Sequence, residues 1–269
     1  MKGLRLLILV ILAGVVLKAI VGSLEPRMVF FPYKGEDATP ASLGIPYDDV
    51  ALTASDGERL VAWQLEPEAP RADIVYFHGN GGNLSLWLPV LAALHRLDYR
   101  VLALDYRGYG RSTGSPTEEG LYLDADAAAR HAASHRTPGR PLVFWGRSLG
   151  GAAAASATRA VTPDGLVLES AFPTKASVIR FNPVLRPLNL FGRYRFDTVG
   201  LLREFRRPVL VMHGERDTII PFALGRELFE QLAGPREFVA IPGADHNDFF
   251  DPANGAYWEP VSRFIGALR

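Results

Sequence analysis

The stretch Gly146-Arg147-Ser148-Leu149-Gly150 matches the pattern G-x-S-x-G and decides the fold of this chain. It follows the apolar run 142–145, expected to be a strand, and precedes the small-residue run 150–160, expected to be a helix. A serine on so sharp a turn is strained, and flanking glycines let strand and helix pass closely. The sequence therefore predicts Ser148 as a nucleophile, with the Leu149 N–H free to stabilise an oxyanion. The alternative is a serine that merely caps the helix.

Outward from this turn, short apolar runs alternate with helix-like segments, the pattern of a mainly parallel sheet covered on both faces. With 142–145, we expect eight strands: 49–53, 60–65, 74–77, 101–104, 142–145, 166–168, 209–212 and 238–241. We expect helices at 84–95, 118–134, 150–160, 223–232 and 257–268. The segment 170–205 breaks the alternation, because proline and arginine there separate Phe181, Leu185, Leu188, Leu190 and Phe191. We expect it to form a short cap insertion, at about 171–205.

Three further landmarks accompany the serine turn. They are His78-Gly79-Asn80-Gly81-Gly82-Asn83, Asp105-Tyr106-Arg107-Gly108-Tyr109-Gly110-Arg111-Ser112 and His213-Gly214-Glu215-Arg216-Asp217. In this order, the motifs are similar to those of the α/β-hydrolase superfamily, and more narrowly to its membrane-anchored serine-hydrolase branch, which includes depalmitoylase-like and esterase-like proteins. The resemblance extends from about Val50 to the C-terminus. It implies the α/β-hydrolase fold and says little about the substrate.

The resemblance also implies the chain order nucleophile, acid, histidine, with the acid and the histidine in loops after late strands. His246 follows the last predicted strand and is the expected base, whereas His213 ends a strand and is expected to be structural. Asp217 is the expected acid, with Glu215 as its nearest rival. Asp245 is discounted because adjacent residues seldom present their side chains to one another.

The glycine-rich loop after the 74–77 strand implies a second oxyanion donor, because this fold draws one from a strand–helix loop at this point. We expect the Asn80 N–H to act beside the Leu149 N–H. The alternative is a tight turn with no ligand role, since glycine-rich turns are common.

Composition excludes several other classes of function. Lys plus Arg and Asp plus Glu each number 29 in 269 residues, so no basic surface for nucleic acid is expected. The chain has no cysteine, which rules out disulfides, thiolate metal sites and a cysteine nucleophile. No histidine or carboxylate cluster has metal-ligand spacing, and no nucleotide-binding glycine pattern occurs. We therefore expect no cofactor and no metal.

The first 24 residues form a separate segment before a hydrolase domain at 25–269. Leu6–Leu17 is an unbroken apolar run, and Leu4–Leu24 is long enough to cross a bilayer if Lys18 reaches an interface. Lys2 and Arg5 favour a cytoplasmic N-terminus, which would put the domain in the periplasm or outside the cell. A cleaved signal peptide and a secreted protein are the alternative, although a good small-x-small cleavage site is missing.

These observations predict an enzyme that transfers an acyl group to water. Ser148, His246 and Asp217 would cleave an ester or thioester of a small or lipidated acyl substrate, with Asn80 and Leu149 binding the oxyanion. A serine peptidase with the same triad, or a binding scaffold without activity, are the alternatives.

Overall fold

A computed structural model describes residues 2–181, 189, 191–248 and 254–268 of the chain. The predicted sheet of eight strands is confirmed. Its strand order is β10-β9-β8-β7-β4-β6-β3-β2. β3 runs antiparallel to both of its neighbours, and all other strands of the sheet run parallel. The strands are β2 (Tyr47–Thr53), β3 (Arg59–Leu65), β4 (Ala72–Phe77), β6 (Tyr99–Asp105), β7 (Leu142–Arg147), β8 (Gly165–Glu169), β9 (Val209–Gly214) and β10 (Arg236–Ile241).

Helices cover both faces of this sheet, because side chains along each buried strand point alternately to opposite sides. In β4, Val75 and Phe77 face one core, whereas Ile74 and Tyr76 face the other. The first core includes α3 (Glu118–Ser134), α4 (Gly150–Ala160) and α8 (Phe222–Gln231). The second includes α2 (Leu84–Arg96) and α9 (Gly255–Gly266). The predicted helices are thus present, with ends shifted by at most two residues.

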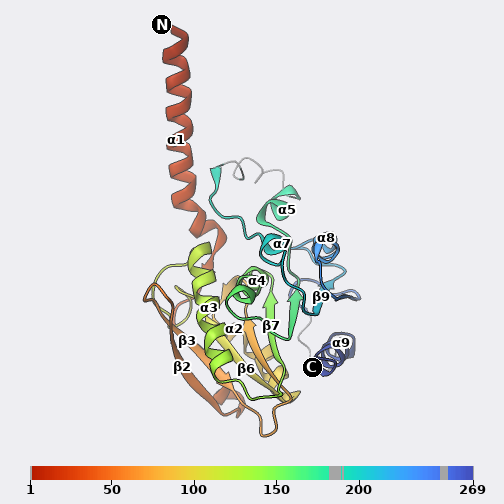
Figure 1. Cartoon of the computed structure of the whole chain (residues 1–269). Helices are drawn as coiled ribbons and strands as arrows, with labels where there is room; N and C mark the ends of the chain where they lie inside the picture. Colours follow the sequence, from red (N-terminus) through yellow and green to blue (C-terminus); the bar gives the residue numbers. More distant parts are fainter. Residues whose placement is uncertain (1, 182–188, 190, 249–253, 269) are drawn as a thin grey trace.

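Smaller elements gather near the carboxyl ends of the parallel strands. A two-stranded sheet pairs β1 (Phe31–Pro32) with β5 (Gly81–Gly82). The segment predicted as a cap contains the short helices α5 (Lys175–Arg180) and α7 (Thr198–Leu201), which lie above α4 in Figure 1. Leu185, Leu188 and Leu190 of that prediction lie outside the described residues. A 3-10 helix, η1 (Pro40–Leu43), precedes β2.

The N-terminal segment is one helix, α1 (Lys2–Val29), which projects away from the domain (Figure 1). Within Gly3–Val29, the most apolar window has a mean hydropathy of 2.7, and none of that window is buried in the protein. By length and composition, this helix can cross a membrane. It extends five residues beyond the predicted boundary at residue 24, and its last turns contact the domain.

Candidate active site

Ser148 lies on the turn between β7 and α4, with a φ of 52°. Such a φ is costly for a residue with a side chain, so the surrounding structure must hold it. The Ser148 amide donates to the Glu169 carbonyl at 2.8 Å. The flanking glycines leave no room for a side chain. A Cβ on Gly146 would lie 2.3 Å from the Gly150 oxygen, and one on Gly150 would lie 2.0 Å from the Phe77 oxygen.

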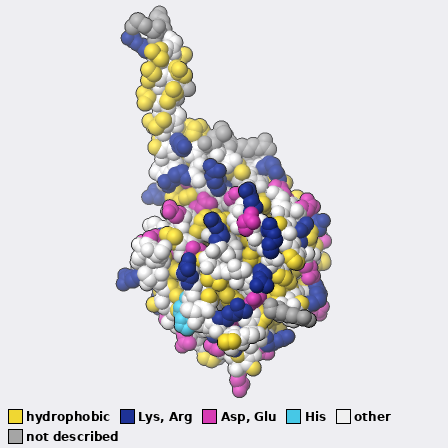
Figure 2. Space-filling view, viewed as in Figure 1, with side chains coloured by type: hydrophobic (Ala, Val, Ile, Leu, Met, Phe, Trp, Pro, Cys, Tyr) yellow, Lys and Arg dark blue, Asp and Glu magenta, His cyan; other side chains and the backbone are white. Residues whose placement is uncertain are grey.

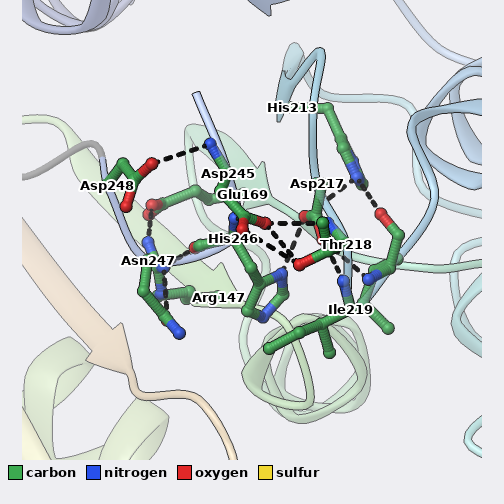
Figure 3. Close-up of polar contacts among 11 residues, drawn as sticks. Arg147, Glu169, His213, Asp217, Thr218, Ile219, Asp245, His246, Asn247 and Asp248 are labelled. Carbon is green, nitrogen blue, oxygen red and sulfur yellow. Dashed lines mark hydrogen bonds and ion pairs between the residues drawn. The ribbon is translucent and has the colours of Figure 1, made fainter. Parts of the chain in front are cut away.

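His246 and Asp217 come from neighbouring loops, after β10 and β9 respectively, and their side chains meet (Figure 3). His246 Nδ1 and Asp217 Oδ2 are 2.7 Å apart. The amides of Ile219 and Ile220 donate to Asp217 Oδ1 at 3.0 and 2.7 Å, which fixes the carboxylate. With Nδ1 engaged in this way, the other ring nitrogen of His246, Nε2, is left for proton transfer.

Asp217 stays ionised although it is buried. Burial alone would raise the pKa of its carboxyl, but the hydrogen bonds from His213 and His246 outweigh that effect and hold the pKa well below its usual value. His213 Nε2 lies 3.3 Å from Asp217 Oδ2 and 2.8 Å from the Ile220 carbonyl oxygen. His213 therefore helps to hold the Asp217 carboxylate in place and ionised.

Two residues whose role the sequence did not reveal hold the His246 loop in place. Asp245 Oδ1 accepts from the amides of Thr218 and His246 at 2.7 and 2.6 Å, so it joins the two loops (Figure 3). Arg147, fully buried, pairs with Glu169 of β8 and donates to the main-chain carbonyl of His246. G-x-S-x-G leaves the position of Arg147 open, and no pattern in the sequence predicts its reach across 99 residues.

Ser148 and His246 line one cavity of about 610 Å³. Within the described part of the chain, no hydrogen bond joins the two side chains, and catalytic hydrogen bonds are often long before substrate binds. The amides of Asn80 and Leu149, which also line the cavity, make no hydrogen bond to any described residue. Two unpaired N–H groups beside a serine are suited to bind a developing oxyanion.

The Asn80 side chain joins its loop to the end of α1. Asn80 Nδ2 donates to the Val29 carbonyl, and the Phe31 amide donates to Asn80 Oδ1 at 3.3 Å. The Tyr109 hydroxyl donates to Asn80 Oδ1 and to its carbonyl oxygen, at 3.0 and 2.9 Å. The loop that carries the Asn80 amide is therefore held from both sides.

The cavity walls are mostly apolar. Among the described residues that line it, Lys175 and His246 are the ones that can carry a charge, and none is Asp or Glu. The segment 171–205, predicted as a cap, contributes Phe172, Lys175, Val178, Ile179 and Phe196. Within the described ranges, no group of three or more His, Asp or Glu side chains is placed to hold a metal ion.

Comparison with known proteins agrees with this architecture. Residues 68–195 match the family model described as serine aminopeptidase, S33. The α/β hydrolase domain-containing protein WAV2 of Arabidopsis thaliana is 31% identical, over 95% of this chain and 91% of that protein. Protein bem46 of Schizosaccharomyces pombe is 32% identical over 84% of this chain and 79% of that protein. An uncharacterized membrane protein of Saccharomyces cerevisiae is 33% identical over 84% and 82%, which together with α1 indicates membrane anchoring.

Among solved structures, an esterase of Pyrococcus furiosus superposes with a TM-score of 0.73 at 19% identity, covering 89% of this chain and 98% of its own. An esterase from a Rhodococcus species superposes with a TM-score of 0.62 at 21% identity, covering 82% of this chain and 99% of its own. These similarities concern the fold, whereas the relatives above 30% identity establish descent. The chain belongs to the α/β-hydrolase superfamily, in the group that includes WAV2, bem46 and the yeast membrane protein.

Proposed function

We propose that the protein is a serine hydrolase that cleaves carboxylic ester or thioester bonds of acyl substrates through an acyl-enzyme. One observation carries the proposal: strained Ser148 and His246, whose ring is hydrogen-bonded to Asp217, line the same apolar cavity. A serine is a weak nucleophile unless a base, itself oriented by a third group, takes its proton.

In the proposed reaction, Ser148 Oγ attacks the substrate carbonyl carbon while His246 Nε2 takes its proton. The carbonyl oxygen becomes an oxyanion that the amides of Asn80 and Leu149 stabilise. When the tetrahedral intermediate collapses, the bond to the leaving alcohol or thiol breaks, and His246 gives that group the proton. Water then attacks the acyl-enzyme with His246 as base, which releases a carboxylic acid and restores Ser148.

The cavity wall favours an ester or thioester over a peptide, the second candidate substrate. An aminopeptidase must hold the charged α-amino group of its substrate, and a buried ammonium needs a carboxylate partner. The described lining residues include no Asp or Glu, whereas the apolar side chains of Leu86, Trp87, Phe172 and Ile179 suit an acyl chain.

We further propose that α1 is retained as a single-pass anchor with its N-terminus in the cytoplasm and the domain on the opposite, extracytoplasmic side. The charges of Lys2 and Arg5 support this orientation. Contacts from the last turns of α1 to Arg193 and Lys175 support retention, because α1 then forms part of the folded protein.

The test is labelling of the full-length protein, in detergent, with a fluorophosphonate probe. We expect the wild type to be labelled and Ser148→Ala and His246→Ala to remain unlabelled. Ser156→Ala, a buried serine of α4 outside the cavity, is the matched control and should be labelled like the wild type. A folded wild type that is not labelled would overturn the proposal in favour of a scaffold without activity.

A further inference from the structure

We propose that the cavity is loaded from the bilayer, and that its substrate is the long-chain acyl ester of a membrane-resident lipid. In this arrangement, the face around the cavity mouth lies on the lipid headgroups. The inference rests on the proposed function and names the substrate class of that same site.

The anchor helix ends at the cavity. Val29 is the last residue of α1, and both Val29 and Phe31 line the cavity wall. Phe30 between them is buried against the rings of Tyr194 and Phe196, with centroids 5.7 and 6.0 Å away. No flexible tether therefore separates the helix from the site: the chain leaves α1 and enters the cavity wall within two residues.

The length of α1 determines where the cap segment lies relative to the bilayer. Its 28 residues span about 42 Å, whereas a hydrocarbon core of about 30 Å takes about 20 residues. With the core beginning at Leu4, it ends near Ser23, so the last turns lie among the headgroups. Arg193 donates to the Gly22 carbonyl at 2.7 Å, which places this part of the cap segment at the boundary between the hydrocarbon core and the headgroups.

A buried ion pair fastens the cap segment to α1. Glu25, largely buried, accepts from Lys175 Nζ at 2.6 Å and from the Arg193 amide at 2.5 Å. The pair neutralises Lys175 where it lines the cavity, so the site presents an apolar wall rather than a free cation. The same contacts fix the cavity mouth relative to the bilayer.

Exposed apolar side chains occur in the cavity lining and next to it in the chain. Phe31, Leu86 and Ile219 line the cavity, whereas Met28 precedes the lining residue Val29 and Phe181 lies two residues after the lining residue Ile179. All five have 48–60% of their surface exposed. An apolar patch of this kind on a water-soluble domain marks a binding surface, and here it adjoins a helix suited to span a membrane. Exposed Lys18, Arg27 and Arg193 add positive charge near the base of α1, where basic side chains gather in Figure 2. Such cations favour a layer of anionic headgroups.

The experiment compares two esters with one leaving group. Full-length protein is reconstituted in vesicles of phosphatidylcholine and phosphatidylglycerol, and offered 4-methylumbelliferyl palmitate within the bilayer or 4-methylumbelliferyl butyrate in solution. Met28→Glu and Phe181→Glu each place a charge on the face proposed to lie on the headgroups, here called the docking face, without altering the cavity lining. The matched control is Ala69→Glu, an exposed position in the β3–β4 connection, which lies at the amino ends of the parallel strands.

We expect each docking-face variant to cleave the palmitate at least tenfold more slowly and the butyrate within twofold of the wild type. The control should match the wild type on both esters. The inference is overturned if the wild type cleaves butyrate but not the vesicle-borne palmitate, or if the variants change both esters equally or neither. A wild type that cleaves neither ester and escapes the fluorophosphonate instead contradicts the proposed function itself.

Discussion

Arg147, the residue before Ser148, donates a hydrogen bond to the main-chain carbonyl of His246. Its guanidinium also pairs with Glu169, whose other carboxylate oxygen accepts from Trp145 Nε1 at 2.9 Å. All of these side chains are buried. The last residue of β7 therefore connects the serine turn to the histidine loop.

Substitutions at Arg147 should distinguish its contribution to the stability of the fold from its role in positioning the His246 loop. Arg147→Met leaves the Glu169 carboxylate buried without its partner, and we expect the free energy of unfolding to fall by about 3–5 kcal/mol. Adding Glu169→Gln removes the unpaired charge and should restore much of that loss. The turnover number of the double variant should nevertheless stay at least tenfold below wild type, because the His246 carbonyl still lacks its donor. Denaturant unfolding and ester hydrolysis measure the two effects, and wild-type turnover in the double variant would contradict the positioning role.

Asp217→Asn tests the acid. The amide cannot hold His246 in the same protonation pattern, and in a serine protease such a change lowers turnover by on the order of 10⁴. The Ile219 and Ile220 amides can still donate to the remaining carbonyl oxygen, so the loop should keep its shape. Glu215→Gln, the rival acid, is the matched control and should retain wild-type turnover. The opposite ranking of these two variants would transfer the role of the acid to Glu215.

Asn80→Ala tests the link between the oxyanion loop and α1. The main-chain amide remains, but the bonds to Val29 and Phe31 are lost. One oxyanion donor contributes about a hundred- to a thousandfold, so a loosened loop should lower turnover by about tenfold to a hundredfold. The Michaelis constant for a short soluble ester should change little, because the loss falls on the transition state. Steady-state kinetics check this, and an increase in the Michaelis constant alone would mean that Asn80 contacts the substrate instead.

Gly150→Ala tests the steric requirement of the serine turn. The new Cβ would lie 2.0 Å from the Phe77 carbonyl oxygen, so α4 must move away from β4. We expect more than about 3 kcal/mol of lost stability, at the upper end for single substitutions, together with loss of fluorophosphonate labelling. Gly266→Ala is the matched control, since a Cβ there meets nothing within 4 Å. Similar unfolding midpoints for the two variants would contradict the close approach.

Asp105→Asn tests a buried carboxyl at the end of β6. Burial raises the pKa of Asp105 to about 7 from an ordinary 3.8, despite the hydrogen bond from the Leu84 amide. At pH values between these two pKa values, folding therefore takes up a proton at Asp105. The stability contributed by protonated Asp105 is complete below about pH 4 and is lost as the pH rises through about 7. Asparagine keeps an acceptor for Leu84 and removes the titration. From pH 4 to 7, the free energy of unfolding of the variant should rise relative to wild type by up to about 4 kcal/mol. Urea unfolding at several pH values measures this, and a constant difference would refute it.

The sequence could predict the sheet because each strand is a short apolar run between turn residues. Glu118–Ser134 and Gly150–Ala160 match the observed helices at both ends, since Thr117 caps the first and the serine turn starts the second. Chain order predicts that Asp217 pairs with His246, and the structure contains the hydrogen bond between them. The catalytic roles of the two residues stay predictions.

Contacts between residues far apart in the chain could not be predicted from the sequence. Arg147 is one unspecified position of its motif, and the sequence marks Glu25 only as the first residue after the predicted apolar segment 1–24. Their partners, Glu169 and Lys175, are separated from them by 22 and 150 residues. Local periodicity contains no information about such pairs, because it reports only which face of an element is buried.

The continuity of α1 with the cavity wall has a consequence for proteolytic release. Many membrane enzymes are shed as active soluble forms by one cut in a stalk. In this chain, a cut between Glu25 and Phe31 would separate the partner of Lys175 from the domain, and a cut after Val29 would also remove the carbonyl that accepts from the Asn80 side chain. Shedding at that point would thus switch the protein off rather than set it free, and would confine its chemistry to the membrane in which it was made.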